Sequence, residues 1–270
     1  MIVDEKTYKN ILIESKKFAS NAKYGTHLSS FGSEGIDFRE LSEYNEGDDI
    51  RKIHWPTSAK KQSLYVKKFD ESKNLSIHII SLLSGSLYFG SDILKQELLA
   101  RIVAILSYAT IFQKDTLNSA IFIDEVKHKF KNIKKSSSVT SIIKQILEYE
   151  VIGSSIDYEA LSKYISSIKK RSVIFLVGDF MSDISALKVS SKHDVRAIVV
   201  RDKFEENPKN LNNISFINPE TNEIVSSLPL QNYSNMVECQ NHIIRQSFYK
   251  YRIKSTQLNS HNLNKKIKFI

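Results

Sequence analysis

The sequence predicts an open, doubly wound α/β domain with a mostly parallel sheet. Three short runs, residues 75–83, 172–177 and 194–200, are almost uniformly apolar, which is typical of strands buried on both faces. Helical patterns separate these runs, and the pattern over residues 92–112 is apolar around most of its circumference. A helix of this kind packs against a sheet and a neighbouring helix. We therefore expect helices on both faces of the sheet.

The first quarter of the chain has a different character. Apolar residues at helical spacing predict an opening helix over residues 8–22. The glycines that follow are interleaved with aromatic and aliphatic residues, which indicates tight backbone geometry rather than a flexible linker. These glycines are Gly25, Gly32, Gly35 and Gly47. Residues 63–69 alternate in polarity, as a strand does.

The rest of the chain completes the α/β pattern. We expect a strand pair at 117–123 and 126–133, helices at 139–149 and 158–168, a small hairpin at 214–217 and 223–225, and a last helix at 235–253. Asp157 is placed to cap the second of the two middle helices. The expected organisation is an N-terminal helix and Gly-rich collar (1–74), an α/β domain (75–255) and a basic C-terminal tail (256–270).

Composition limits the class of protein. The 270 residues are 41% hydrophobic and 26% charged, which argues against a mostly disordered chain. The single cysteine, Cys239, excludes an intramolecular disulfide framework and suits a reducing compartment. The first residues lack the apolar core of a signal peptide, and no run approaches the roughly 18 apolar residues of a spanning helix. We expect a soluble, cytoplasmic protein.

The net charge of +9 is informative only once it is located. Two-thirds of the excess lies from Lys250 onward, where six basic residues occur and no acid. This region suggests an alternative function, binding of nucleic acid or another anionic surface. However, we find no basic helix with base-reading side chains, so a solvated lysine-rich surface is the favoured interpretation and nucleic acid is not an expected partner.

In doubly wound sheets, ligands bind at the carboxyl ends of the strands. Two loops lie there, Ser84-Gly85-Ser86 and Gly178-Asp179, and Thr140 at the start of a helix offers a further hydroxyl. Such oxygen ligands suit Mg²⁺, although that ion usually has more than one carboxylate. The favoured alternative is a hydrogen-bonded turn in which the serines cap the helix that starts near Asp92. A metal-dependent hydrolase at this edge is the least favoured hypothesis.

Motifs of common enzymes are absent from the sequence. There is no Walker-type loop, no G-x-S-x-G elbow and no H-E-x-x-H pair. The seven histidines lack metal-ligand spacing. We interpret His78, in an apolar strand, as a satisfied core residue and Cys239 as a packing residue. The chain is therefore not expected to be an enzyme or to need a cofactor.

One segment carries a specific resemblance. Residues 25–69, which we call the hallmark segment, closely resemble the signature of the domain-of-unknown-function 58 family (DUF 58). The matching positions, at fixed spacing, are Gly35, Asp37, Phe38, Leu41, Tyr44, Gly47, Asp48, Asp49, Arg51, Ile53, Trp55, Ser58 and Ala59. Looser matches follow at residues 84–90, 178–180 and 193–208. Departures from the pattern are Ser42, His54 and Lys60.

The resemblance implies a fold, a partner and a degenerate metal site. It implies a doubly wound, Rossmann-like domain similar to von Willebrand factor type A, and an adaptor that works with a MoxR-type AAA+ ATPase rather than an enzyme. Related domains bind Mg²⁺ through an Asp-x-Ser-x-Ser loop, a later Thr and a later Asp. Ser84, Ser86 and Asp179 match that set and Thr140 is a candidate, but Leu82 replaces the leading Asp.

The hallmark segment itself has two compatible interpretations. Its aromatic residues Phe38, Tyr44 and Trp55 could hold it against the sheet, because buried aromatics are usually packing residues. Alternatively, the segment is a surface for the partner protein. The family-like residues proposed for that surface are Gly35, Phe38, Tyr44, Gly47, Asp48, Asp49, Arg51 and Trp55. Asp48 and Asp49 could also pair with Arg51 and Lys52.

Overall fold

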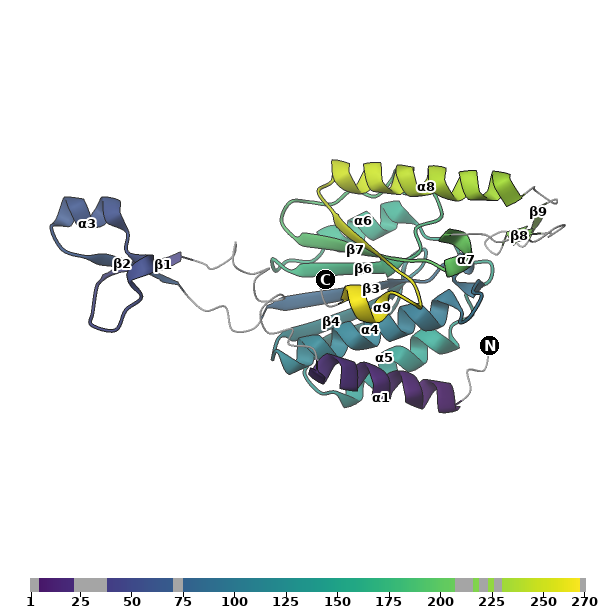
Figure 1. The fold of residues 1–270 in the computed structure, drawn as a ribbon, viewed down its shortest axis with the longest axis horizontal. Coiled ribbons are helices and arrows are strands. Elements are labelled where there is room, and N and C mark those ends of the chain that lie inside the picture. Colours follow the sequence, from purple (N-terminus) through teal and green to yellow (C-terminus); the bar gives the residue numbers. More distant parts are fainter. Residues whose placement is uncertain are drawn as a thin grey trace. The chain divides into compact units, whose positions relative to one another are not determined.

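The chain forms two compact units in a computed structural model (Figure 1). One unit comprises residues Gly25–Leu75, and the other comprises Met1–Tyr24 together with Ser76–Ile270. The structure describes residues 5–21, 38–69, 75–206, 216–218, 223–225 and 230–267. We describe the larger unit first and the smaller unit by itself afterwards.

A six-stranded sheet is the centre of the larger unit. Along the described chain its order is β10-β7-β6-β3-β4-β5. The strands are β3 (Ser76–Leu82), β4 (Thr116–Phe122), β5 (Val126–Ile133), β6 (Val173–Gly178), β7 (Asp194–Val200) and β10 (Lys254–Leu258). All neighbours pair in parallel except β5, which is antiparallel to β4. The predicted mostly parallel α/β sheet is confirmed.

Helices cover both faces of this sheet (Figure 1). The helices α4 (Lys95–Phe112), α5 (Ser137–Glu148) and α1 (Glu5–Asn21) lie on one side, with α1 and α5 both packed against α4. The helices α6 (Tyr158–Ser166) and α8 (Leu230–Lys250) lie on the other. Successive side chains of β3 point to opposite faces of the sheet. Ile80 and Leu82 point to the face covered by α6 and α8, where they join an apolar cluster. Asp157 caps α6 as predicted, accepting hydrogen bonds from the N–H groups of Glu159 and Ala160.

Short elements complete the larger unit. They are the 3-10 turn η2 (Gly85–Tyr88), α7 (Lys203–Glu206), α9 (Leu263–Lys266), and the antiparallel pair β8 (Phe216–Asn218) and β9 (Glu223–Val225). The pair β8–β9 is the hairpin that the sequence predicts, and the four residues between its strands lie outside the described residues.

Two boundaries differ from the sequence-based division. The region assigned to a basic tail from residue 256 instead contains most of β10, which pairs in parallel with β7 from Lys254↔Arg196 to Leu258↔Val200. The opening helix α1 belongs to the larger unit rather than to the collar: the Tyr8 hydroxyl donates to the carbonyl of Thr140 (2.9 Å), and Glu14 pairs with Arg101 (3.0 Å).

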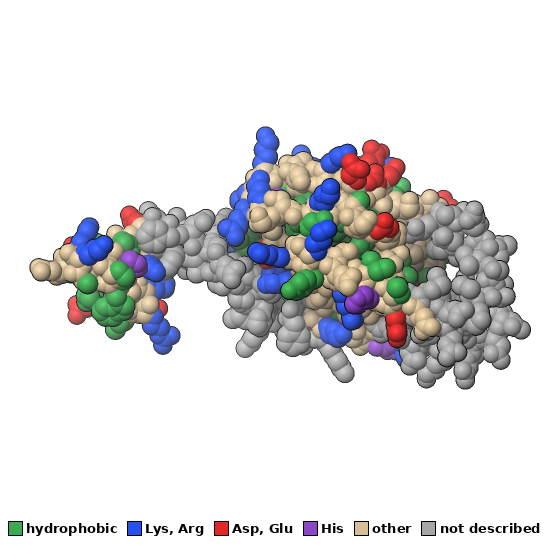
Figure 2. All heavy atoms as spheres, turned by 90° about the horizontal axis from the view of Figure 1, so that it is seen from above, with side chains coloured by type: hydrophobic (Ala, Val, Ile, Leu, Met, Phe, Trp, Pro, Cys, Tyr) green, Lys and Arg blue, Asp and Glu red, His purple; other side chains and the backbone are tan. Residues whose placement is uncertain are grey.

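The smaller unit consists of the hallmark segment. Its described elements are β1 (Phe38–Glu43), the 3-10 turn η1 (Ile50–Lys52), α3 (Trp55–Lys61) and β2 (Tyr65–Phe69), with β1 antiparallel to β2. Ile53, Ser58 and Val66 are buried in it. The Ser58 hydroxyl accepts from the N–H of Tyr65 (2.8 Å), which ties α3 to β2. Figure 2 shows hydrophobic side chains gathered on one face of this unit.

Candidate functional site

Three adjacent strands, β3, β6 and β7, end side by side and carry polar residues in the loops that follow. We call this region the carboxyl edge. The Ser84 hydroxyl, after β3, donates to Oδ1 of Asp179, after β6, over 3.1 Å. The hydroxyl groups of Ser84 and Ser86 are 2.9 Å apart. The structure thus brings together three of the four residues that the sequence proposes as ligands.

A buried lysine, which the sequence does not single out, lies at the centre of the same edge. Lys95, the first residue of α4, is 1% exposed. Its Nζ is 2.7 Å from Oε1 of Glu205 and 3.3 Å from Oδ2 of Asp179. The second oxygen of Glu205 accepts from the N–H of Asp202 (2.9 Å). One ammonium group therefore links α4 to the loop after β6 and to α7, the short helix after β7.

A second layer of polar contacts surrounds Lys95. The buried guanidinium of Arg201 donates to the carbonyl oxygens of Asp179 and Val200 and to the Asn241 side chain on α8. Asp202 accepts hydrogen bonds from the backbone and hydroxyl of Ser91 (3.0 and 2.8 Å). Because buried charges are costly unless they are paired and hydrogen-bonded, these contacts are what permits so many charged groups to be buried together.

The electrostatics of Asp179 follow from these neighbours. Burial by itself raises the pKa of this carboxyl group. The Lys95 ammonium, the Ser86 hydroxyl and the Arg201 guanidinium oppose burial and hold the pKa below its usual 3.8. The next residue, Phe180, has a φ of 55°, a left-handed conformation that is uncommon outside glycine. Asp179 is therefore ionised and fixed in a tightly constrained turn.

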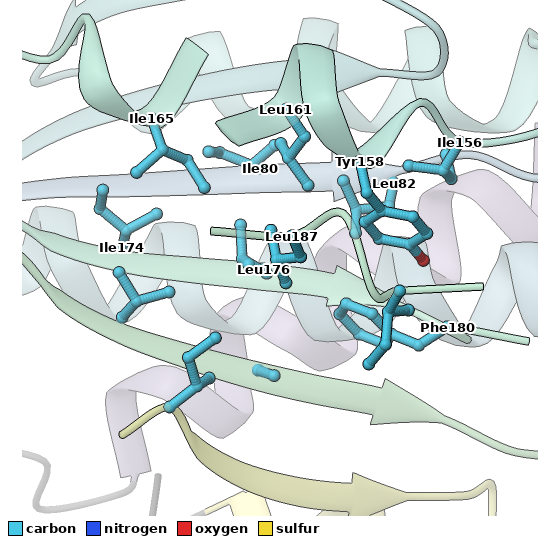
Figure 3. Packing of buried hydrophobic residues seen from close by; sticks show 14 of the residues in the cluster. Ile80, Leu82, Ile156, Tyr158, Leu161, Ile165, Ile174, Leu176, Phe180 and Leu187 are labelled. Carbon is cyan, nitrogen blue, oxygen red and sulfur yellow. The ribbon is translucent and has the colours of Figure 1, made fainter. Parts of the chain in front are cut away.

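The residues of the carboxyl edge do not fit the Mg²⁺ site that the resemblance implies. Leu82 stands where the leading carboxylate is required, and its side chain lies beside Tyr158 in the apolar cluster shown in Figure 3. A Cβ on Gly178 would come within 2.9 Å of Leu82 Cβ, so the two strands are in close contact there. In the described part of the chain, no group of three or more His, Cys, Asp or Glu residues is arranged to hold a metal.

Thr140 is not brought to this edge. Strand β5 runs antiparallel to β4, from Val126 opposite Phe122 to Ile133 opposite Leu117. The chain therefore leaves β5 at the amino end of β4, and α5 begins there. Thr140, in the first turn of α5, consequently lies at the opposite edge of the sheet from Ser84 and Asp179.

Two further sequence-based interpretations need correction. The serines do not cap the helix after them: α4 begins at Lys95 rather than near Asp92, and its N-cap residue, Leu94, makes no side-chain capping bond. Ser84 and Ser86 instead bond to each other and to Asp179. Cys239, interpreted as a packing residue, is exposed on α8.

In the hallmark segment, several family-like residues shape the backbone. Gly47 has a φ of +104°, which explains the need for glycine. Asp48 accepts from the N–H of Asn45 (2.9 Å), and Asp49 caps η1 by accepting from the N–H of Arg51 (3.0 Å). These carboxylates therefore hold backbone groups. Phe38 begins β1 and Tyr44 follows it, whereas Gly35 and Asp37 lie outside the described residues.

Other residues of the hallmark segment face solvent. Trp55, the first residue of α3, is 64% exposed, and Ile50 on η1 is 65% exposed. Leu64, just before β2, is also exposed. Trp55 is therefore not buried within the smaller unit itself. Each of these large apolar side chains is available for contact with another protein.

Comparison with known proteins places the hallmark segment in a family. The model of the family described as "Protein of unknown function DUF58" matches residues 40–250, which is well over half of the chain. The chain belongs to the DUF58 family. The match covers residues 40–69 of the hallmark segment and the carboxyl edge of this DUF58 chain.

Other comparisons add no functional information. No curated protein is significantly similar to the chain. A solved structure titled conserved hypothetical protein BatB, from Bacteroides thetaiotaomicron, is 11% identical with a TM-score of 0.40, covering 72% of this chain and 96% of that one. An aerotolerance-related membrane protein from Bacteroides fragilis is 10% identical with a TM-score of 0.37 and the same coverage. Among the residues that the structure describes, no helix is both long and apolar enough to span a bilayer.

Proposed function

We propose that this DUF58 chain is a non-enzymatic adaptor that binds a MoxR-type AAA+ ATPase during the maturation or assembly of other proteins in the cytoplasm. The partner and the von Willebrand factor A-like character of the larger unit come from the family resemblance. The observation that carries the proposal is the 64% exposure of Trp55 in a compact unit built from the family's hallmark segment.

The charge pattern around Trp55 supports a protein partner. Arg51, Lys52, Lys60 and Lys61 are exposed near it in sequence, and Glu43, Glu46 and Asp49 are exposed in the same unit. Mixed charge around exposed apolar residues resembles the polar rim of a protein interface. An exposed tryptophan is also the residue type most often found at binding hot spots.

The carboxyl edge supports the non-enzymatic part of the proposal. Its acidic residues Asp179 and Glu205 are committed to Lys95, and Asp202 is committed to Ser91. A general acid or base needs access to a substrate proton, and these groups are buried. The arrangement is suited to holding loops together rather than to turnover.

Binding of the MoxR-type ATPase from the same genome tests the proposal. Trp55 is the only tryptophan in the chain, so labelling with 5-fluorotryptophan gives a single ¹⁹F resonance that reports on this surface alone. We expect this resonance to shift when the ATPase is added in at least one of its ATP, ADP or nucleotide-free states. We also expect Trp55→Ala to weaken binding about tenfold or more.

A matched control distinguishes a specific binding surface from non-specific binding by any exposed aromatic residue. Tyr249 is an 87% exposed aromatic on α8, in the larger unit, and Tyr249→Ala should leave the affinity unchanged. Equal losses from Trp55→Ala and Tyr249→Ala would contradict a surface in the hallmark segment. The absence of association in every nucleotide state would contradict the partner itself.

A further inference from the structure

The carboxyl edge contains a cation that the chain supplies itself. The Lys95 ammonium contacts one carboxylate from the loop after β6 and one from the segment after β7. Lysine is seldom fully buried unless it is paired, and here both partner side chains are only 4% exposed. The position of this charge therefore requires an explanation.

Each carboxylate oxygen around Lys95 already accepts a hydrogen bond. Asp179 accepts from Ser84 at Oδ1 and from Lys95 at Oδ2. Glu205 accepts from Lys95 at Oε1 and from the Asp202 N–H at Oε2. A Mg²⁺ ion would have to displace these donors and then complete an octahedral shell at about 2.0–2.1 Å. With apolar Leu82 at the leading ligand position, strand β3 offers no carboxylate to help it do so.

The arrangement nevertheless resembles a sheet edge at which a bound ion holds the segments after neighbouring strands together. A cation between segments that follow neighbouring parallel strands draws those segments together, and Lys95 does this for the loop that contains Asp179 and for α7, which contains Glu205. Lys95 is the first residue of α4, and its Nζ also lies 5.7 Å from the centre of the Phe89 ring. The cation is thus fixed covalently to the helix.

We propose that the Lys95 ammonium takes the place of a bound metal ion at the carboxyl edge, so that these segments keep one arrangement without any added ion. The edge is then insensitive to metal availability. This proposal does not depend on the identity of the partner, because it concerns only contacts within the larger unit.

Thermal unfolding of the full-length wild-type chain, with added metal or with chelator, tests directly whether the ammonium replaces a metal ion. We expect the wild-type Tm to be the same in EDTA and in millimolar Mg²⁺ or Mn²⁺. A ligand that binds only the native state would raise the Tm. A wild-type Tm that rises with Mg²⁺ and falls in EDTA would overturn the proposal, whatever the behaviour of any variant.

Two substitutions at position 95 test the role of the ammonium. We expect Lys95→Ala to lower the Tm by several degrees and to recover part of the loss in millimolar Mn²⁺, because it frees two carboxylates and leaves space for an ion. Lys95→Met should lower the Tm without recovery, because its side chain fills that space. The control is Lys144→Ala, at a 60% exposed lysine on α5, which should behave as wild type.

Either of two results with these variants would also overturn the proposal. One is a Lys95→Ala protein as stable as wild type, which would mean that the ammonium holds nothing together. The other is equal behaviour of Lys95→Ala and Lys95→Met in Mn²⁺, which would mean that the space is not a cation position. If Lys95→Ala does not fold, the wild-type metal titration still decides between the alternatives.

Discussion

At the scale of single residues, the carboxylate of Asp179 determines how the larger unit responds to acid. Its folded-state pKa is lowered, because Lys95, Ser86 and Arg201 outweigh the opposing effect of burial. A group whose folded pKa is depressed stabilises the fold at every pH above its unfolded value of about 3.8. That contribution is lost only when the pH falls through the lower folded value.

Replacement of Lys95 by methionine should reverse this dependence. Without the ammonium, burial dominates and the folded pKa of Asp179 rises above its unfolded value, so its contribution to stability is lost as pH rises through that raised value. We expect Lys95→Met to lose about 3–5 kcal/mol near neutral pH and less near about pH 5. Urea unfolding of both proteins at the two pH values measures the difference. A loss that does not change with pH would contradict this account.

His78, on β3, provides a second pH-sensitive group. Burial, then the charges of His193 and Lys129, lower its pKa from 6.5 to about 4. The unfolded chain therefore takes up a proton near pH 6.5 while the folded chain does not. The fold loses stability as the pH falls from about 6.5 to about 4.

We expect His78→Gln to lessen this loss of stability. Urea unfolding between neutral pH and about pH 4.5 measures it as the slope of unfolding free energy against pH. His242→Gln, at an exposed position on α8, is the control and should keep the wild-type slope. Identical slopes for wild type and His78→Gln would show that this histidine is protonated equally in both states.

Single residues also show how much of the carboxyl edge can be predicted from the sequence. Ser84, Ser86 and Asp179 could be placed together because they follow parallel strands, whose carboxyl ends share an edge. Lys95 could not, because lysine at the start of a helix is normally exposed and nothing in the local pattern indicates that it turns inward. Glu205, more than a hundred residues later, supplies the second acidic partner, and only the fold brings the two together.

At the scale of secondary structure elements, the direction of β5 and the position of β10 at the edge of the sheet account for the main differences from the sequence-based predictions. Thr140 lies at the other end of the sheet because β5 runs antiparallel to β4. The two-residue connection between the runs at 117–123 and 126–133 already requires this reversal. The sequence-based division places most of β10 in a tail, since the run from Lys254 to Leu258 is largely polar. An edge strand has one neighbour and needs fewer apolar residues than a central strand.

The strand assignment of β10 makes a prediction about Leu258. This residue is fully buried and pairs opposite Val200, so Leu258→Ala should cost about 2–5 kcal/mol of unfolding free energy. Ser255→Ala, at an exposed position of the same strand, should change it by less than about 0.5 kcal/mol. Chemical denaturation of both variants measures the difference. A basic tail without structure would tolerate the two changes equally.

At the scale of the whole molecule, the two units differ in the apolar core that their described residues form. The larger unit has an extensive apolar core on both faces of its sheet and a carboxyl edge closed by its own ion pairs. Among its described residues, the smaller unit buries few apolar side chains, chiefly Ile53 and Val66, and exposes others. Small units with limited cores are marginally stable, so the two units should differ in how readily they open.

Hydrogen exchange with peptide resolution can test this separation. Ile53 is 9% exposed and forms an isolated bridge with Val66. Ile53→Asp places a charge at one of the buried positions described in the smaller unit, so peptides from 38–69 should lose their protection. Peptides from β3 and β6 should keep wild-type protection, because their core lies in the other unit.

The matched control is Ile50→Asp, a change of the same kind at a 65% exposed residue of the same unit. It should leave protection over 38–69 intact, because no buried apolar surface is lost. Faster exchange in β6 of the Ile53→Asp protein would show that the two units unfold together. In that case a defect of the Ile53→Asp protein in binding the ATPase could not be assigned to the hallmark segment. Retained protection in β6 would allow Trp55 and its neighbours to be varied without disturbing the ion pairs of Lys95.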